Sequence, residues 1–176
     1  MPYSAAEGKP WVVEQYRRLK PRDVVDLGCG AGTYARLLRP VRRSDWTGVE
    51  IHAPYIDRFD LRNVYDRVIQ CDVLAFCRFL DGVNPNSTPM YGLIIAGDLI
   101  EHLPPDDGVT LVTAMRRHAR AALVAAPIIE WPQGAIDGNP HEAHLTHYTA
   151  DTLRDLVQPT TEWVGEQVGY FLWERP

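Results

Sequence analysis

The stretch VVDLGCGAGTYARLL, residues 24–38, joins two apolar runs through a glycine-rich turn. Residues 24–27 form a compact apolar run of the kind found in buried strands, and residues 33–38 have helical spacing and end before Pro40. The turn between them contains Gly28, Gly30 and Gly32. Glycine lets the backbone approach a ligand without interference from Cβ, and amides at the start of a helix point outward. The stretch therefore predicts a strand, a turn and a helix, with a ligand at the turn.

Strand-like and helical runs alternate along the rest of the chain. Strands are expected within residues 24–27, 45–51, 66–72, 91–97 and 121–127, and helices at 33–38, 73–80, 108–118 and 149–157. This alternation predicts parallel strands joined by right-handed crossovers. The last two runs, residues 162–168 and 170–173, have no helix between them and should pair antiparallel around Gly169. We expect an α/β doubly wound, mostly parallel sheet with helices on both faces.

The composition is typical of a soluble cytoplasmic protein. With 176 residues the chain is long enough for one domain with a sizeable core, and its net charge of −5 provides no basic surface for nucleic acid or an anionic membrane. Three cysteines without paired spacing are expected to be reduced thiols. The first residues lack the apolar run of a signal peptide, and no run approaches the ~20 apolar residues of a membrane helix.

Acidic residues lie at the ends of four successive predicted strands: Asp26, Glu50, Asp72 and Asp98. Ligands of doubly wound sheets bind outside the carboxyl ends of the strands. A carboxylate beside the glycine turn would repel a pyrophosphate but suits a ligand with an ammonium and a sulfonium group. Glu50 is placed to accept hydrogen bonds from two ribose hydroxyls, and Asp72 from an adenine amino group.

Together these elements resemble those of the class I S-adenosylmethionine-dependent methyltransferases. VVDLGCGAG looks like the glycine-rich turn of that family, GVEI like its ribose-binding acidic residue, CDVL like its adenine-contacting element and GDLIEHLP like the element after its fourth strand. The likeness covers about residues 24–156. It implies a small Rossmann-like enzyme that uses S-adenosyl-L-methionine, with a seven-stranded sheet in the order 3-2-1-4-5-7-6 and strand 7 antiparallel.

The resemblance, with the strand ends, also implies which residues contact the cofactor. They are Asp26, Gly28, Gly30, Gly32, Glu50, Asp72, Val73, Gly97 and Asp98. We expect one domain over residues 1–176, with a leading helix in residues 1–20. Residues 128–148 have no clear period, and loops of that length are often lids or binding loops. We expect this loop on the side of the methyl acceptor.

The expected acceptor is an oxygen or nitrogen of a small molecule or sugar-like group. His144 is the first candidate for a general base or for positioning the acceptor, because small-molecule and saccharide-tailoring members of the family often carry a similar Asn-Pro-x-Glu-x-His run. Alternatively, His144 and Glu142 brace the loop. His102 can also reach the transfer site in this fold, or it caps the next turn together with Glu101.

Other functions stay open at this stage. No Asn-Pro-Pro-Tyr signature follows the fourth strand, so a nucleic-acid acceptor is not expected. The loop histidines His141, His144 and His147 fit no standard zinc spacing, so no metal is expected. A sensor or scaffold could bind the methyl donor without transferring a methyl group. A nicotinamide-dependent oxidoreductase could use the same fold, although Asp26 and Asp72 disfavour it. The oligomeric state is not predicted.

Overall fold

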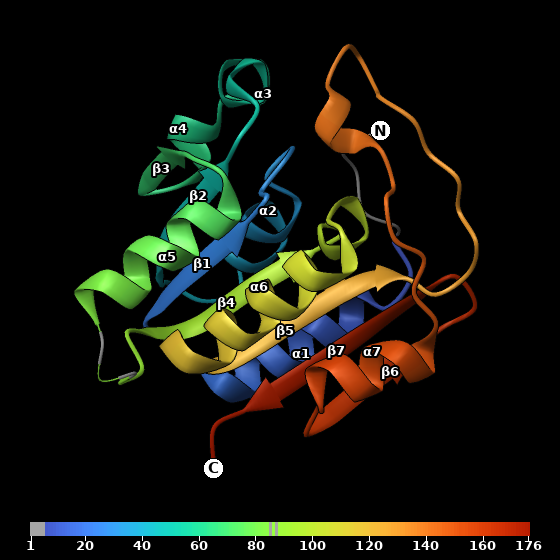
Figure 1. Cartoon of the computed structure of the whole chain (residues 1–176). Coiled ribbons are helices and arrows are strands. Elements are labelled where there is room, and N and C mark those ends of the chain that lie inside the picture. The colour runs from blue at the N-terminus through green and yellow to red at the C-terminus, as the bar shows by residue number, and fades with distance from the viewer. Residues whose placement is uncertain (1–5, 85, 87) are drawn as a thin grey trace.

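The computed structural model describes residues 6–84, 86 and 88–176, and these contain a seven-stranded sheet (Figure 1). Its strands are β1 (Asp23–Leu27), β2 (Asp45–Glu50), β3 (Arg67–Gln70), β4 (Tyr91–Gly97), β5 (Ala119–Pro127), β6 (Thr161–Val164) and β7 (Val168–Glu174). Their spatial order is β3-β2-β1-β4-β5-β7-β6, and β7 pairs antiparallel with both of its neighbours. The predicted sheet order and the reversed strand are confirmed. Positions 1–5, 85 and 87 of the predicted domain, including the start of its leading segment, lie outside the described residues.

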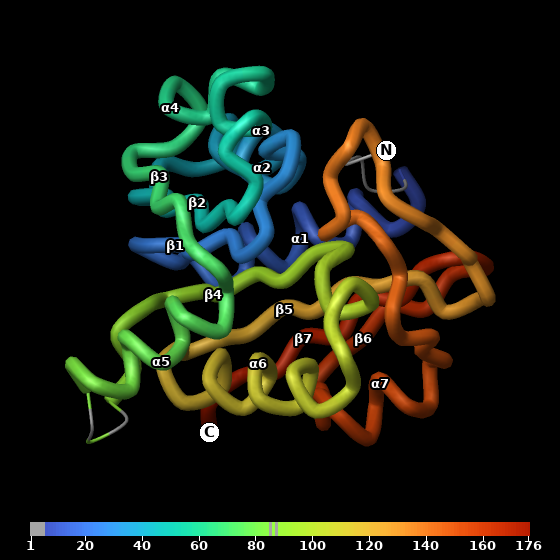
Figure 2. The backbone as a smooth tube through the Cα atoms, turned by 45° about the horizontal axis from the view of Figure 1, so that its top comes forward, coloured from blue at the N-terminus to red at the C-terminus, as the bar shows by residue number. Residues whose placement is uncertain are grey.

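Helices cover both faces of the sheet, as Figures 1 and 2 show. One face packs against α5 (Val73–Val83), α6 (Pro105–His118) and α7 (Ala150–Val157). The other packs against α1 (Lys9–Leu19), α2 (Thr33–Leu38), α3 (Ala53–Arg58) and α4 (Leu61–Val64). Each face therefore has its own apolar core, and β1 and β4 contribute to both. None of the helices in the described part of the chain is long and apolar enough to cross a bilayer.

Some boundaries differ from the predicted ones. Helix α6 begins at Pro105 instead of residue 108, because a proline in the first turn and the acidic pair after it favour a helix start. Helices α3 and α4 and the short 3₁₀ turns η1 (Ile100–His102) and η2 (Pro140–Glu142) were not predicted. Elements of so few residues have too little periodicity to detect and depend on tertiary packing for their stability.

The predicted hairpin turn around Gly169 is wrong. The turn lies at residues 165–167, and Gly169 is inside β7, where a Cβ would come within 2.6 Å of the Phe171 ring. The Glu7 carboxylate, from the other end of the chain, accepts hydrogen bonds from three consecutive backbone amides: those of Glu166, Gln167 and Val168. A long-range contact therefore positions the turn, and the local glycine signal misplaced it.

Candidate functional site

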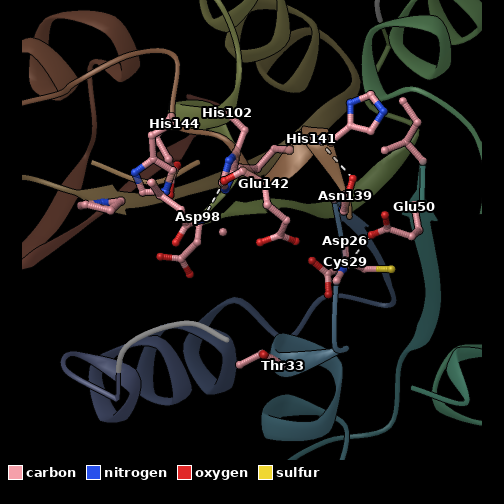
Figure 3. A pocket seen from close by; sticks show the side chains of 18 of the residues that line it. Asp26, Cys29, Thr33, Glu50, Asp98, His102, Asn139, His141, Glu142 and His144 are labelled. Atoms are coloured by element: carbon pink, nitrogen blue, oxygen red, sulfur yellow. Dashed lines mark hydrogen bonds between the residues drawn. The ribbon is translucent and has the colours of Figure 1, made fainter. Parts of the chain in front are cut away.

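A cavity of about 320 Å³ lies at the carboxyl ends of β1, β2 and β4 (Figure 3). This volume lies within the range of small-molecule sites. The glycine turn, the ends of β2 and β4, η1 and parts of the segment from residue 131 to residue 144 line it. Of the predicted cofactor and catalytic residues, those that line the cavity are Asp26, Gly28, Gly30, Glu50, Gly97, Asp98, His102 and His144. The fold thus gathers most of the predicted site in one place.

The glycine turn owes its conformation partly to the chain's own packing. All three glycines have positive φ, which side chains resist. A Cβ at Gly28 would lie 2.6 Å from the Leu99 side chain, and one at Gly32 would lie 3.2 Å from Val64. The Gly30 amide donates to Glu50 Oε2 at 2.9 Å. The turn is therefore shaped by its neighbours, and Gly30 connects it to the end of β2.

Glu50 ends β2 and is buried, with its carboxylate held by two backbone amides. Oε2 accepts from Gly30 and Oε1 accepts from the His52 amide at 2.8 Å. Burial raises the pKa of Glu50, and the two amides act against that rise. A carboxylate has about four acceptor positions, so each oxygen can accept a further hydrogen bond. The predicted contact with a ribose stays compatible with this geometry.

Asp26 is buried at the end of β1 and accepts a hydrogen bond from the Tyr65 hydroxyl at 2.6 Å. Burial raises the pKa of Asp26 to about 7, and the Tyr65 bond and the charge of Lys9 oppose this rise. Lys9, the first residue of α1, has its Nζ 3.9 Å from the centre of the Tyr34 ring. Burial lowers the pKa of Lys9 to about 8. The sequence analysis did not identify Lys9, because the residues next to it in the sequence do not line the cavity and form no motif.

Two carboxyl groups follow β4 with one oxygen each left unpaired. Asp98 Oδ2 and Glu101 Oε2 are buried and have no hydrogen-bond partner among residues 6–84, 86 and 88–176. Asp98 adopts a positive φ of 52°, which is uncommon for a residue with a side chain. Burial, followed by the charge of Asp98, raises the pKa of Glu101 well above its usual value. This end of the cavity therefore contains two carboxyl groups, each with a buried oxygen, in a poorly solvated setting.

His102 and His144 meet at the same end, with their ring centres 4.8 Å apart in an edge-to-face arrangement. The Nδ1 of His102 lies 3.1 Å from the Ala143 carbonyl oxygen, and that of His144 lies 2.6 Å from the Trp131 carbonyl oxygen. A carbonyl can only accept, so each Nδ1 carries the proton and each neutral ring has its lone pair on Nε2. Burial lowers the pKa of His102, which favours its neutral form.

The loop of residues 128–148 lies along the whole cavity. At one end, the carbonyl of Glu101 accepts from the amides of Leu145 and Thr146. Farther along, Asp137 forms an ion pair of 2.6 Å with Arg58 of α3, next to the end of β2. The loop residues that line the cavity are Trp131, Gln133, Asn139, His141, Glu142 and His144. The loop was expected beside the acceptor, and it also reaches the end of the cavity that contains Glu50.

Three of the predicted cofactor residues do not line this cavity. Asp72 is the N-cap of α5 and accepts from the Ala75 amide at 2.8 Å, and Val73 is buried in the core next to it. Gly32 immediately precedes α2. An acidic residue before a helix is a common cap, and this local role explains Asp72 without a ligand. Its contact with an adenine stays a prediction.

Comparison with known proteins gives a likeness in structure alone. No family model matches the chain, and no curated protein matches it in sequence. A SAM-dependent methyltransferase from Archaeoglobus fulgidus superposes with a TM-score of 0.64 at 13% identity, covering 95% of this chain and 94% of the other. The N-terminal domain of EvdMO1, solved with SAH bound, superposes at 0.65 with 12% identity, covering 98% and 83%. The mitomycin 7-O-methyltransferase MmcR superposes at 0.64 with 12% identity, covering 96% and 52%.

The chain has the fold of the SAM-dependent methyltransferases. At these identities the likeness concerns the methyltransferase fold itself.

The pH dependence of ligand binding tests the role of Asp26 in this methyltransferase fold. Since its pKa is about 7, Asp26 is mostly protonated at pH 6 and mostly ionised at pH 8. The ionised form would attract a cationic ligand, so affinity for S-adenosylmethionine, which carries a sulfonium and an ammonium group, should rise about tenfold between these pH values. Calorimetry at both pH values measures this. Asp26→Asn should bind weakly at both, and an equal pH response in that variant would exclude Asp26 as the titrating group.

Proposed function

We propose that the protein is an S-adenosylmethionine-dependent methyltransferase acting on an oxygen or nitrogen of a small-molecule or sugar-like acceptor. The observation that carries this proposal is the carboxylate-rich cavity at the strand ends of a methyltransferase fold, with Asp26, Glu50 and Asp98 around it. The donor carries a sulfonium and an ammonium group, and carboxylates in a poorly solvated cavity favour such a cation. The SAH bound to the N-terminal domain of EvdMO1 supports the same cofactor here.

The two ends of the cavity suggest two roles. We infer that the glycine turn and Glu50 hold the donor, while His102 and His144 face the acceptor. Methyl transfer is an in-line displacement at an activated carbon, so alignment and exclusion of water supply much of the rate. A base is needed where the acceptor arrives protonated, and the Nε2 lone pairs of the two histidines suit that need.

The cavity and the charge of the chain both favour a small-molecule acceptor. The volume of the cavity and the loop along it favour a small molecule, and the net charge of −5 disfavours nucleic acid. MmcR, with the same fold, is named for a transfer to oxygen. We also place the enzyme in the cytoplasm, because Cys29, Cys71 and Cys77 are best explained as thiols of a reducing compartment.

Ligand binding and turnover together test this proposal. Calorimetry with S-adenosylmethionine, S-adenosylhomocysteine and the reduced nicotinamide dinucleotide should show binding of the first two alone. Formation of S-adenosylhomocysteine with a panel of hydroxyl and amine acceptors should then reveal transfer. Binding without turnover on any acceptor would favour the sensor or scaffold. Preference for the nicotinamide cofactor would end the methyltransferase proposal.

Replacing Glu50 by alanine should weaken S-adenosylhomocysteine binding at least tenfold. The variant loses two hydrogen bonds to the ribose, together worth about 2–4 kcal/mol, and also loses the bond that holds the Gly30 amide. Calorimetry measures the change. Glu166→Ala is the matched control, because that side chain is exposed and does not line the cavity. Equal affinity in Glu50→Ala and the control would exclude the ribose contact.

A further inference from the structure

Three potential metal ligands meet at the acceptor end of the cavity. The ligand atoms of Glu101, His102 and His144 all lie within 4.8 Å of one another. The first two belong to η1, directly after β4, and His144 comes from the loop after β5. Figure 3 shows the side chains of His102 and His144 side by side at the cavity. His144 is far from Glu101 and His102 in the sequence, so only the folding of the chain brings the three ligand atoms together.

Both histidines are held in the form that binds metals. Their Nδ1 protons are donated to the carbonyls of Ala143 and Trp131, so both neutral rings have the lone pair on Nε2. Metal-binding histidines generally donate their other ring nitrogen to a carbonyl or carboxylate, which fixes the ring and its tautomer. The Ala143 and Trp131 carbonyls supply this second layer of contacts.

Glu101 is a buried carboxyl group with one oxygen unpaired within the described part of the chain. Its side chain is only 3% exposed, and no described residue forms a hydrogen bond with its Oε2. The charged groups that act on it are the carboxylates of Asp98 and Glu142, and both have the same sign. A buried carboxylate without a partner is costly, and a bound cation removes that cost.

We propose that Glu101, His102 and His144 bind one divalent transition-metal ion. Two imidazoles and one carboxylate form a common three-residue set for catalytic zinc, with open positions for water or substrate. Imidazole suits Zn²⁺ and its neighbours, whereas Mg²⁺ and Ca²⁺ prefer oxygen ligands throughout. The sequence spacing of His141, His144 and His147 gave no metal pattern, because two of the ligands come from another segment.

A metal ion at this site would also favour a hydroxyl group as the methyl acceptor. This inference about the acceptor rests on the proposed function. An acceptor hydroxyl at an open position would lose its proton to solvent water more readily, because the metal lowers its pKa. Its oxygen then forms a bond to the methyl carbon while the carbon–sulfur bond breaks, and the electron pair of that bond stays on sulfur. The products are the methyl ether, S-adenosylhomocysteine and one proton. A hydroxyl acceptor follows from this chemistry.

Metal titration tests the site without any acceptor. Protein free of an affinity tag and stripped with a chelator should bind one equivalent of Zn²⁺ in calorimetry, and Co²⁺ should give visible absorption bands. Loss of a direct ligand in His144→Ala, His102→Ala or Glu101→Gln should weaken Zn²⁺ binding at least about 100-fold. The control is His147→Ala, which removes an exposed histidine of the same loop and should bind as the wild type does. Mg²⁺ should compete poorly.

Two results would overturn the proposal: the absence of stoichiometric Zn²⁺ binding, or equal Zn²⁺ affinity in the ligand variants and His147→Ala. Melting temperatures and S-adenosylhomocysteine affinity verify that each variant is folded. These measurements can contradict the metal-site proposal and the proposed function independently of each other. If the metal-free protein binds S-adenosylhomocysteine but no Zn²⁺, the methyltransferase proposal is retained and the metal-site proposal is rejected. If the protein binds Zn²⁺ but neither S-adenosylmethionine nor S-adenosylhomocysteine, the metal-site proposal is retained and the methyltransferase proposal is rejected.

Discussion

Replacing His144 by alanine should lower the rate of methyl transfer about 10²–10⁴-fold while donor affinity changes little. His144 lines the end of the cavity that we assign to the acceptor, and the donor contacts that we infer come from the turn after β1 and the end of β2. This loss is expected whether the ring takes a proton from the acceptor or holds a metal. Single-turnover rates and calorimetry with S-adenosylhomocysteine measure the two quantities separately.

His144→Asn distinguishes chemistry from bracing of the loop. The asparagine amide can still donate to the Trp131 carbonyl, as the histidine Nδ1 does at 2.6 Å, but asparagine has nothing in place of Nε2. We expect wild-type thermal stability and the slow rate of the alanine variant. If His144 only braces the loop, His144→Asn should be almost fully active, and His144→Ala should show a lower melting temperature with a modest rise in acceptor KM.

Replacing Gly30 by valine should abolish cofactor binding. Gly30 has a φ of 51°, a region that β-branched residues resist, and its amide donates to Glu50 Oε2. The valine side chain would enter the space of the donor, or the turn would change shape and release Glu50. Calorimetry with S-adenosylhomocysteine should detect no binding.

The far-UV circular dichroism of Gly30→Val should stay near that of the wild type, because the turn is a small part of the fold. Gly82→Val is a suitable control, since a Cβ at Gly82 meets no atom within 4 Å and its φ is not positive. Unimpaired binding by Gly30→Val would mean that the turn has a structural role alone.

Parallel-strand physics explains why much of the candidate site was predictable. The carboxyl ends of parallel strands lie along one edge of a sheet, so side chains that end successive strands come together. Asp26 and Glu50, from β1 and β2, line the cavity as the strand pattern implied, and so does Asp98, which follows β4. Asp72 shows the limit of this reasoning. It precedes α5 as a helix cap, and an acidic residue before a helix is equally expected from local capping.

The sequence by itself determined the alternation of strands and helices, the antiparallel pairing of the last two strands and the glycine turn, because these follow from local periodicity and chain connectivity. The order of the strands was implied by the resemblance to the methyltransferases. Only the tertiary structure decided which distant groups meet. Glu7 positions the turn between β6 and β7, and the charge of Lys9 acts on Asp26. His144 joins Glu101 and His102 because the loop folds back over η1. Contacts of this kind depend on how the chain packs in three dimensions, and no local pattern of residues records them.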